Sequence, residues 1–94
     1  MKKQELTITP ALIQKYAAFL HEQERSSATI QKYVHDLTAL GDFLAGQPMT
    51  KGLLLEWKEN LIGQYAPASV NNKLAAINGF LAFCGLNELR LRKL

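Results

Sequence analysis

The chain has 94 residues, of which 48% are hydrophobic and 20% are charged, and its net charge is +3. This composition excludes a disordered chain, and the length fits one small domain. The basic balance permits an anionic partner but does not require one. The single cysteine, Cys84, excludes an internal disulfide, and no Cys and His spacing resembles a zinc site. No apolar run is long enough to span a membrane, so we expect a cytoplasmic domain without a metal or cofactor.

Four segments show helical periodicity, and none shows sustained strand alternation. The pattern predicts helices over about residues 10–24, 28–45, 51–62 and 67–84. Hydroxyl residues suited to capping precede the first three helices, at Thr9, Ser27 and Thr50, and Pro67 opens the fourth. Glycines suited to helix ends follow the second, third and fourth, at Gly46, Gly63 and Gly85. The sequence therefore predicts an all-α bundle of four main helices, arranged as two helical hairpins.

The second and fourth predicted helices begin alike, with SATIQKYVHDL at 27–37 and ASVNNKLAAI at 68–77. In both, a small residue is followed by a hydroxyl residue, a β-branched apolar residue and an amide. The apolar members form the core stripes. The others form two polar strips, one of Thr29, Lys32 and His35 and one of Ser69, Asn72, Lys73 and Ala76. The only acidic side chain near either strip is Asp36, which we expect at its flank.

Two interpretations of these strips stay open on periodicity alone. A helix start without acidic residues leaves its N–H groups to an outside anion such as phosphate, and short hydroxyl and amide side chains suit base edges. Alanines at 28, 39 and 76 would allow close approach. The strips could equally be solvated faces, although such faces usually carry Glu and Lys pairs, as Glu56, Lys58 and Glu59 do on the third helix. Leu54, Trp57, Leu61 and Ile62 are expected to face the core from that helix.

Catalysis finds little support in the sequence. His21 and His35 lie on different predicted helices, and no metal-binding or phosphate-loop motif is present. Cys84 and Tyr16 fall on apolar stripes, and a nucleophilic tyrosine needs nearby cations or a base to activate it. We expect that this chain is not an enzyme by itself.

The combination SSATIQKYVHDLTALGDFL and YAPASVNNKLAAINGFLAFCG resembles the N-terminal core-binding (SAM-like) domain of tyrosine recombinases, the phage integrase and Xer-type family. The resemblance covers about residues 8–85. The matching residues are Ser27, Thr29, Tyr33, Asp36, Leu37, Phe43, Leu44, Pro67, Ser69, Val70, Asn71, Lys73, Leu74, Ala76, Ile77, Phe80, Phe83 and Gly85.

The resemblance implies a DNA-binding domain that clamps one side of a recombination site, with its second and fourth helices toward the major groove. Its partners would be double-stranded DNA, a C-terminal catalytic domain of the parent chain and other recombinase protomers on DNA. By position, the DNA contacts would fall on Arg25, Ser26, Ser27, Thr29, Lys32, His35, Ser69, Asn72 and Lys73. The implied division is an N-terminal extension at 1–8, the DNA-binding domain at 9–85 and the start of a linker at 86–94.

The family often has more Arg and Lys on these helices than this chain, whose fourth helix offers only Lys73. Neutralising about 4–5 phosphates would give a log–log salt slope near −4. Replacing Lys32 and Lys73 with Glu is expected to abolish binding without unfolding, because neither lies on a core stripe. The alternative hypothesis is a SAM-like or death-domain-like protein interaction domain that does not bind DNA. A small enzyme would need a ligand-sized pocket with convergent polar groups.

Overall fold

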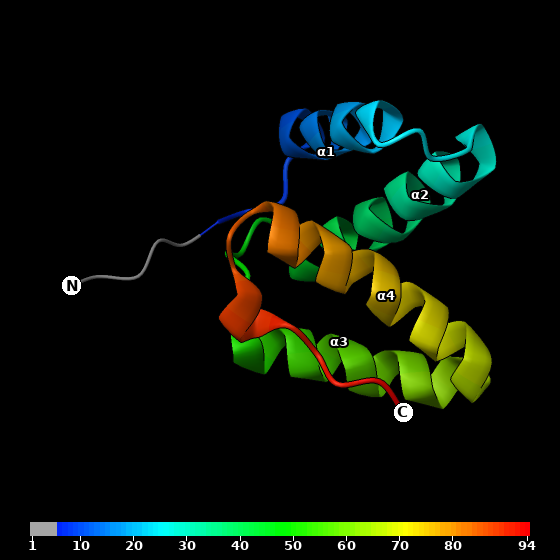
Figure 1. Ribbon diagram of the computed structural model, residues 1–94. Helices are drawn as coiled ribbons and strands as arrows, with labels where there is room; N and C mark the ends of the chain where they lie inside the picture. The colour runs from blue at the N-terminus through cyan, green and yellow to red at the C-terminus, as the bar shows by residue number, and fades with distance from the viewer. Residues whose placement is uncertain (1–5) are drawn as a thin grey trace.

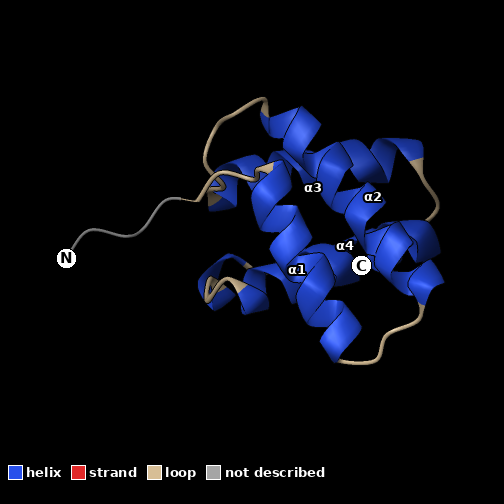
Figure 2. Cartoon of the chain, turned by 90° about the horizontal axis from the view of Figure 1, so that it is seen from above, coloured by secondary structure: helices blue, strands red, loops and turns tan. Residues whose placement is uncertain are grey.

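The computed structural model describes residues 6–94, which form four α-helices followed by a short 3-10 helix (Figure 1). The described residues contain no strand (Figure 2). The helix bounds are α1 Pro10–Glu22, α2 Ser27–Leu44, α3 Lys51–Gln64, α4 Pro67–Phe83 and η1 Asn87–Leu89. The predicted all-α bundle of two helix pairs is confirmed, and α2 and α4 pack against each other at its centre.

The helix starts follow the predicted capping chemistry with one correction. The hydroxyls of Thr9 and Thr50 accept hydrogen bonds from backbone N–H groups in the first turns of α1 and α3, at 3.1 and 3.2 Å. At α2 the predicted cap, Ser27, is wrong. The capping side chain is Ser26, whose Oγ accepts from the N–H of Thr29 at 3.1 Å, and Ser27 is the first helical residue.

The predicted helix ends are accurate to about two residues. Gly46 and Gly85 follow the ends of α2 and α4 with φ angles of +87° and +76°, a conformation that favours glycine. Gly63 does not end α3, which continues to Gln64. α1 ends before the predicted position, since Glu24 already has a left-handed φ of 61°.

The core is built from the apolar stripes of all four helices. Its fully buried side chains are Leu37, Leu40, Leu54, Val70, Leu74, Ala76, Ile77, Phe80 and Leu81, six of which lie on α4. Ile62 was expected in this core, but it is 40% exposed. Leu61 takes the inward position on α3, and the next residue is turned about 100° away from it.

α1 approaches the C-terminal half of α4 closely because Gly79 has no side chain. A Cβ at Gly79 would lie 2.7 Å from Oη of Tyr16, which also packs edge to face on Phe80 with ring centroids 5.4 Å apart. Burial raises the pKa of Tyr16 to about 12. α1 therefore packs against the C-terminal half of α4, whereas side chains in the N-terminal half of α4 remain exposed.

Residues 86–94, the C-terminal segment, fold back onto the bundle. Leu86 and Leu91 are buried in the core. The side-chain amide of Asn78 donates to the carbonyl of Leu91 at 2.8 Å and accepts from its N–H at 2.7 Å. Asn71 holds Leu94 in the same way, at 3.4 and 2.8 Å. These paired hydrogen bonds hold the C-terminal segment in an extended conformation along α4.

α3 holds the same segment from its other side. The ammonium groups of Lys51 and Lys58 donate to the carbonyls of Arg90 and Arg92. At the other end of the chain, the carbonyl of Leu6 accepts from the N–H of Met49 at 2.8 Å. The described parts of the predicted extension and linker therefore pack against the bundle, while residues 1–5 of the extension lie outside the described residues. The division into domain and linker stays a prediction.

Candidate nucleic-acid interface

On α2, the predicted site residues lie along the first three turns. Lys32 and His35 are exposed, and Thr29 is half-buried. The hydroxyl of Ser26 donates to Oγ1 of Thr29 at 2.9 Å while it caps the helix. Arg25, Ser26 and Ser27 are exposed at this start of the helix, and their contact with a DNA backbone stays a prediction.

On α4, the predicted residues separate into two groups. Ser69 and Asn72 are exposed. Lys73 instead points toward α2, with its ammonium 3.1 Å from Oδ1 of Asp36 and 4.8 Å from the ring centroid of Tyr65. Its side chain is only 17% exposed. Lys73 therefore does not lie on an open polar strip, and Lys73→Glu is now expected to destabilise the fold.

Asp36 is the residue that sequence reasoning misplaced most. Instead of lying at the flank of α2, its side chain is 1% exposed, and Oδ1 accepts the bond from Lys73. Oδ2 is buried without a hydrogen-bond partner in the described part of the chain. The sequence held a signal for this burial, because Asp36 lies three residues after Tyr33 and four before Leu40, at the spacing of the core stripe.

The helix starts also correct the interpretation of two open anion sites. None of α1, α2, α3 and α4 has an acidic residue in its first turn, so this absence does not distinguish α2 and α4. At α2, Ser26 occupies one of the free N–H groups, whereas α4 has no side-chain cap. Ala76 is fully buried, so its small size serves the packing of α4 and not the approach of a ligand.

The exposed and half-buried polar residues of the two helices nevertheless form a surface of one character. We call Thr29, Lys32, His35, Ser69 and Asn72 the α2/α4 surface. α2 and α4 both start on the same side of the bundle, in cyan and yellow (Figure 1), and the view from above agrees (Figure 2). No Asp or Glu occurs in α4 or in the first nine residues of α2, Ser27 to His35. This surface is therefore neutral to positive and rich in hydrogen-bonding groups.

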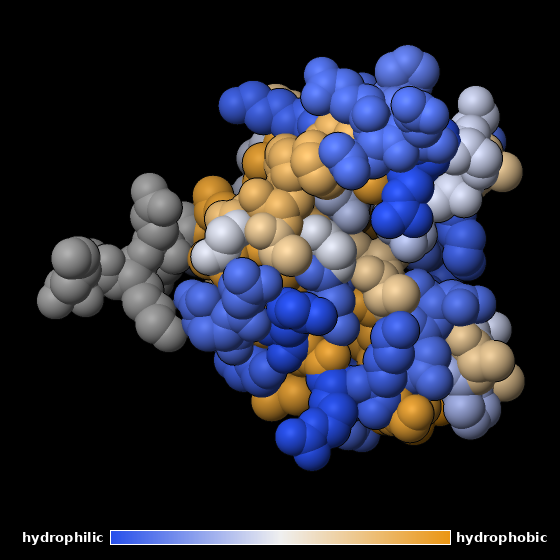
Figure 3. Space-filling model, in the orientation of Figure 1, coloured by the Kyte–Doolittle hydropathy of each residue, from blue (hydrophilic) through white to orange (hydrophobic). Residues whose placement is uncertain are grey.

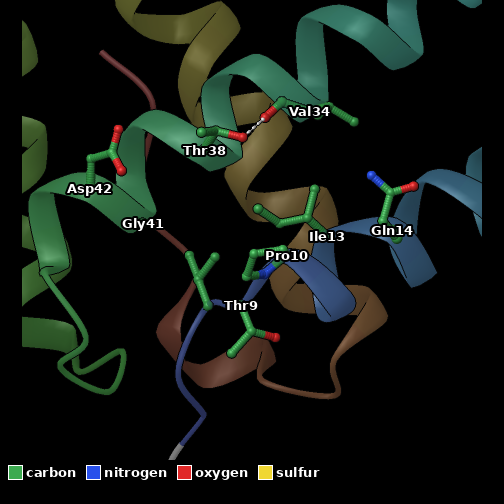
Figure 4. Close-up of a pocket in the computed structure, with 9 residues that line it drawn as sticks. Thr9, Pro10, Ile13, Gln14, Val34, Thr38, Gly41 and Asp42 are labelled. Atoms are coloured by element: carbon green, nitrogen blue, oxygen red, sulfur yellow. Dashed lines mark hydrogen bonds between the residues drawn. The ribbon is translucent and has the colours of Figure 1, made fainter.

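A hollow lies between α1 and α2. Its lining includes Ile8, Ile13 and Val34, and its volume is about 360 Å³ (Figure 4). The hydroxyl of Thr38 donates within its own helix, to the carbonyl of Val34 at 2.8 Å. Asp42 is the only ionisable residue that lines the hollow. Because polar groups do not converge there, and no predicted site residue lines it, the hollow gives no support to an enzyme.

Burial does not activate the two side chains considered as nucleophiles, Cys84 and Tyr16. Burial raises the pKa of the Cys84 thiol, which disfavours the reactive thiolate, and it raises that of Tyr16. Among residues 6–94, no group of three or more His, Cys, Asp or Glu side chains is placed to hold a metal ion.

Comparison with protein families identifies the chain. The family model described as "Phage integrase, N-terminal SAM-like domain" matches residues 13–85, from the first turn of α1 through the end of α4. The chain belongs to this family. The resemblance seen in the sequence is thereby confirmed. No curated protein and no solved structure gives a match.

Membership of the integrase SAM-like family places this chain with the N-terminal part of integrases and not with their catalytic domain. In the part of the chain that the structure describes, every helix is too short or too polar to cross a membrane. The family match does not assign roles to single residues, so the α2/α4 surface is argued on its own geometry below.

Proposed function

We propose that this integrase SAM-like domain is the DNA-binding module of a site-specific tyrosine recombinase and clamps one side of the recombination site through α2 and α4. The observation that supports this most is the α2/α4 surface, which exposes hydroxyl, amide and cationic groups without a carboxylate. Strand cleavage and rejoining would belong to a catalytic domain of the parent chain, acting in the cytoplasm with other protomers on the same DNA.

The residues of the surface suit different contacts. Lys32 is suited to a phosphate, whereas Thr29, His35, Ser69 and Asn72 present short polar groups that can reach base edges. Arg25, Ser26 and Ser27 would meet the DNA backbone at the start of α2. Lys73 would position α4 through Asp36 and would not itself neutralise a phosphate.

This division changes the expected salt dependence. Arg25 and Lys32 are the cations left among the predicted contacts once Lys73 is paired internally. These two cations contribute about −2 to the log–log slope, instead of the −4 that the sequence predicts for the α2 and α4 contacts together. A steeper measured slope would require cations from elsewhere on the domain.

An NMR titration of the labelled chain with a 20-base-pair duplex of mixed sequence tests the proposal. We expect the largest shifts at the N-terminal halves of α2 and α4, and shifts confined to α1 and α3 would overturn the assignment. Lys32→Gln should reduce the steepness of the salt dependence by about 0.9, the contribution of one phosphate. Lys15→Gln on α1, also an exposed lysine, is the matched control and should leave the slope unchanged.

The alternative of a protein interaction domain has one observation in its favour. Leu55 and Ile62, two turns apart on α3, are 45% and 40% exposed. Self-association through this face should appear as a rise in mass by light scattering at increasing concentration. A monomer that binds the duplex would exclude this alternative as the main function.

A further inference from the structure

We propose that Arg90 and Lys93, in the C-terminal segment, provide the phosphate contacts that α4 itself lacks. The inference rests on the proposed DNA-binding function and deepens it, because it names further residues of the interface. Neither residue lies within the matched region 13–85 or among the contacts implied by the resemblance.

The need for such cations follows from the pairing of Lys73. α4 contains no other Lys or Arg, and Lys73 is held by Asp36 on its inner side. A helix that approaches a duplex without an available cation gains little from the phosphate backbone, which dominates DNA affinity. Any positive charge beside α4 must therefore come from a neighbouring element.

The C-terminal segment is held in register beside α4. Asn71 and Asn78 are seven residues apart, which is about 10.5 Å along a helix axis. Their partners Leu94 and Leu91 are three residues apart, which is about 10 Å in an extended chain. The two spacings match, so the segment runs antiparallel to α4 and both asparagines can bond at once.

This register places two cations over a hollow on α4. Arg90 and Lys93 line it together with Ala75, Asn78, Gly79 and Ala82, and its volume is about 290 Å³. We call this the α4 hollow. Its lining has no carboxylate, and the short side chains of Ala75 and Ala82 leave room for a phosphate to approach the helix, while Oη of Tyr16 lies beside Gly79. Asn72 lies three residues before Ala75 on α4, so the α2/α4 surface ends within about one helical turn of the hollow.

The other cations near the segment are engaged differently. Lys51 and Lys58 donate to backbone carbonyls of the segment, so they hold it in place. Arg92 is exposed but does not line the α4 hollow. Figure 3 shows hydrophilic surface over α1 and over the C-terminal segment, with paler and apolar surface along α4 between them. Arg90 and Lys93 are therefore the cations placed to flank α4 on the segment's side.

The test compares salt dependence of binding to a 30-base-pair duplex of mixed sequence, measured by fluorescence anisotropy between 50 and 200 mM salt. Arg90→Gln with Lys93→Gln should reduce the steepness of the log–log slope by about 1.8, that is, about 0.9 for each lost phosphate contact. Arg92→Gln is the matched control from the same segment and should change the slope by much less than 0.9. An unchanged slope in the double variant, or an equal change in the control, would overturn the inference.

A second variant separates placement from net charge. Asn71→Ala with Asn78→Ala keeps every cation but releases Leu91 and Leu94, and it should flatten the slope if the docked segment places Arg90 and Lys93 on the phosphates. Circular dichroism at the binding temperature confirms that the helices persist. Binding equal to that of the wild type would overturn the inference while the proposed function stands. A wild-type chain that binds no duplex would instead overturn the proposed function, and the inference with it.

Discussion

α2 and α4 start with similar sequences, but their polar residues have different roles in the structure. On α2, Lys32 and His35 are exposed, and the inward polar residue is an acid, Asp36. On α4, the lysine turns inward to meet that acid, and only Ser69 and Asn72 stay exposed among the predicted contacts. Whether a lysine is available for binding therefore depends on which residue of the neighbouring helix it faces. The sequence of the lysine's own helix does not contain that information.

Lys73→Met is the substitution expected to change stability most. It should destabilise the domain by about 3 kcal/mol, because removing one partner of a buried ion pair leaves the other charge without compensation. The value lies at the lower end of the usual range because Lys73 is partly exposed. Urea denaturation followed by circular dichroism measures the free energy of unfolding.

Its control is Lys32→Met, which should change the free energy of unfolding by less than about 0.5 kcal/mol, as usual for an exposed substitution. Adding Asp36→Asn to Lys73→Met should restore much of the lost stability, since no buried charge is then unpaired. If the two lysine variants lose stability equally, the contrast between α2 and α4 drawn above is wrong.

A smaller loss of stability is expected from substitutions of the asparagines of α4. Some of these asparagines hold the C-terminal segment, and others face solvent. Asn78→Ala removes the two hydrogen bonds to Leu91 and should cost about 1–3 kcal/mol at typical values for such bonds. Asn72→Ala, at an exposed position on the same helix, should cost less than about 0.5 kcal/mol. Thermal melts of both variants measure the difference, and a reversed order would contradict the described docking.

The smallest expected effect distinguishes the helix starts. Ser26→Ala should cost about 1 kcal/mol, since Ser26 caps α2. Ser27→Ala should be close to neutral because Ser27 is already the first helical residue. Denaturation midpoints in urea report both. A larger loss for Ser27→Ala would restore the cap position that the sequence alone suggested.

The fold was largely readable from the sequence because its signals are local. Thr9, Thr50 and Pro67 define helix starts through their own chemistry, and the apolar stripes have the period of a helix. Gly63 does not mark the end of α3, because a glycine within a helix costs only about 1 kcal/mol and α3 continues through it to Gln64. Helix existence was thus predictable, and exact ends were less so.

The candidate site was less predictable because its determinants are not local. The partner of Lys73 lies 37 positions away, and nothing in the sequence of α4 indicates that its single lysine faces inward. The basic run that includes Arg90 and Lys93 looked like the start of a linker, because the asparagines that hold it are 13 and 23 positions earlier in the chain. Only the packing of α3 and α4 brings these groups together.

The side-chain bonds of Asn71 and Asn78 have a consequence for local opening. The amide hydrogens of Leu91 and Leu94 are bonded to side-chain oxygens and not to a helix backbone, so they become accessible whenever the segment detaches, even while the four helices stay closed. Hydrogen exchange at these two amides therefore reports the undocking equilibrium separately from global unfolding. The exchange rates of these two amides therefore measure how often the C-terminal segment detaches from the four helices.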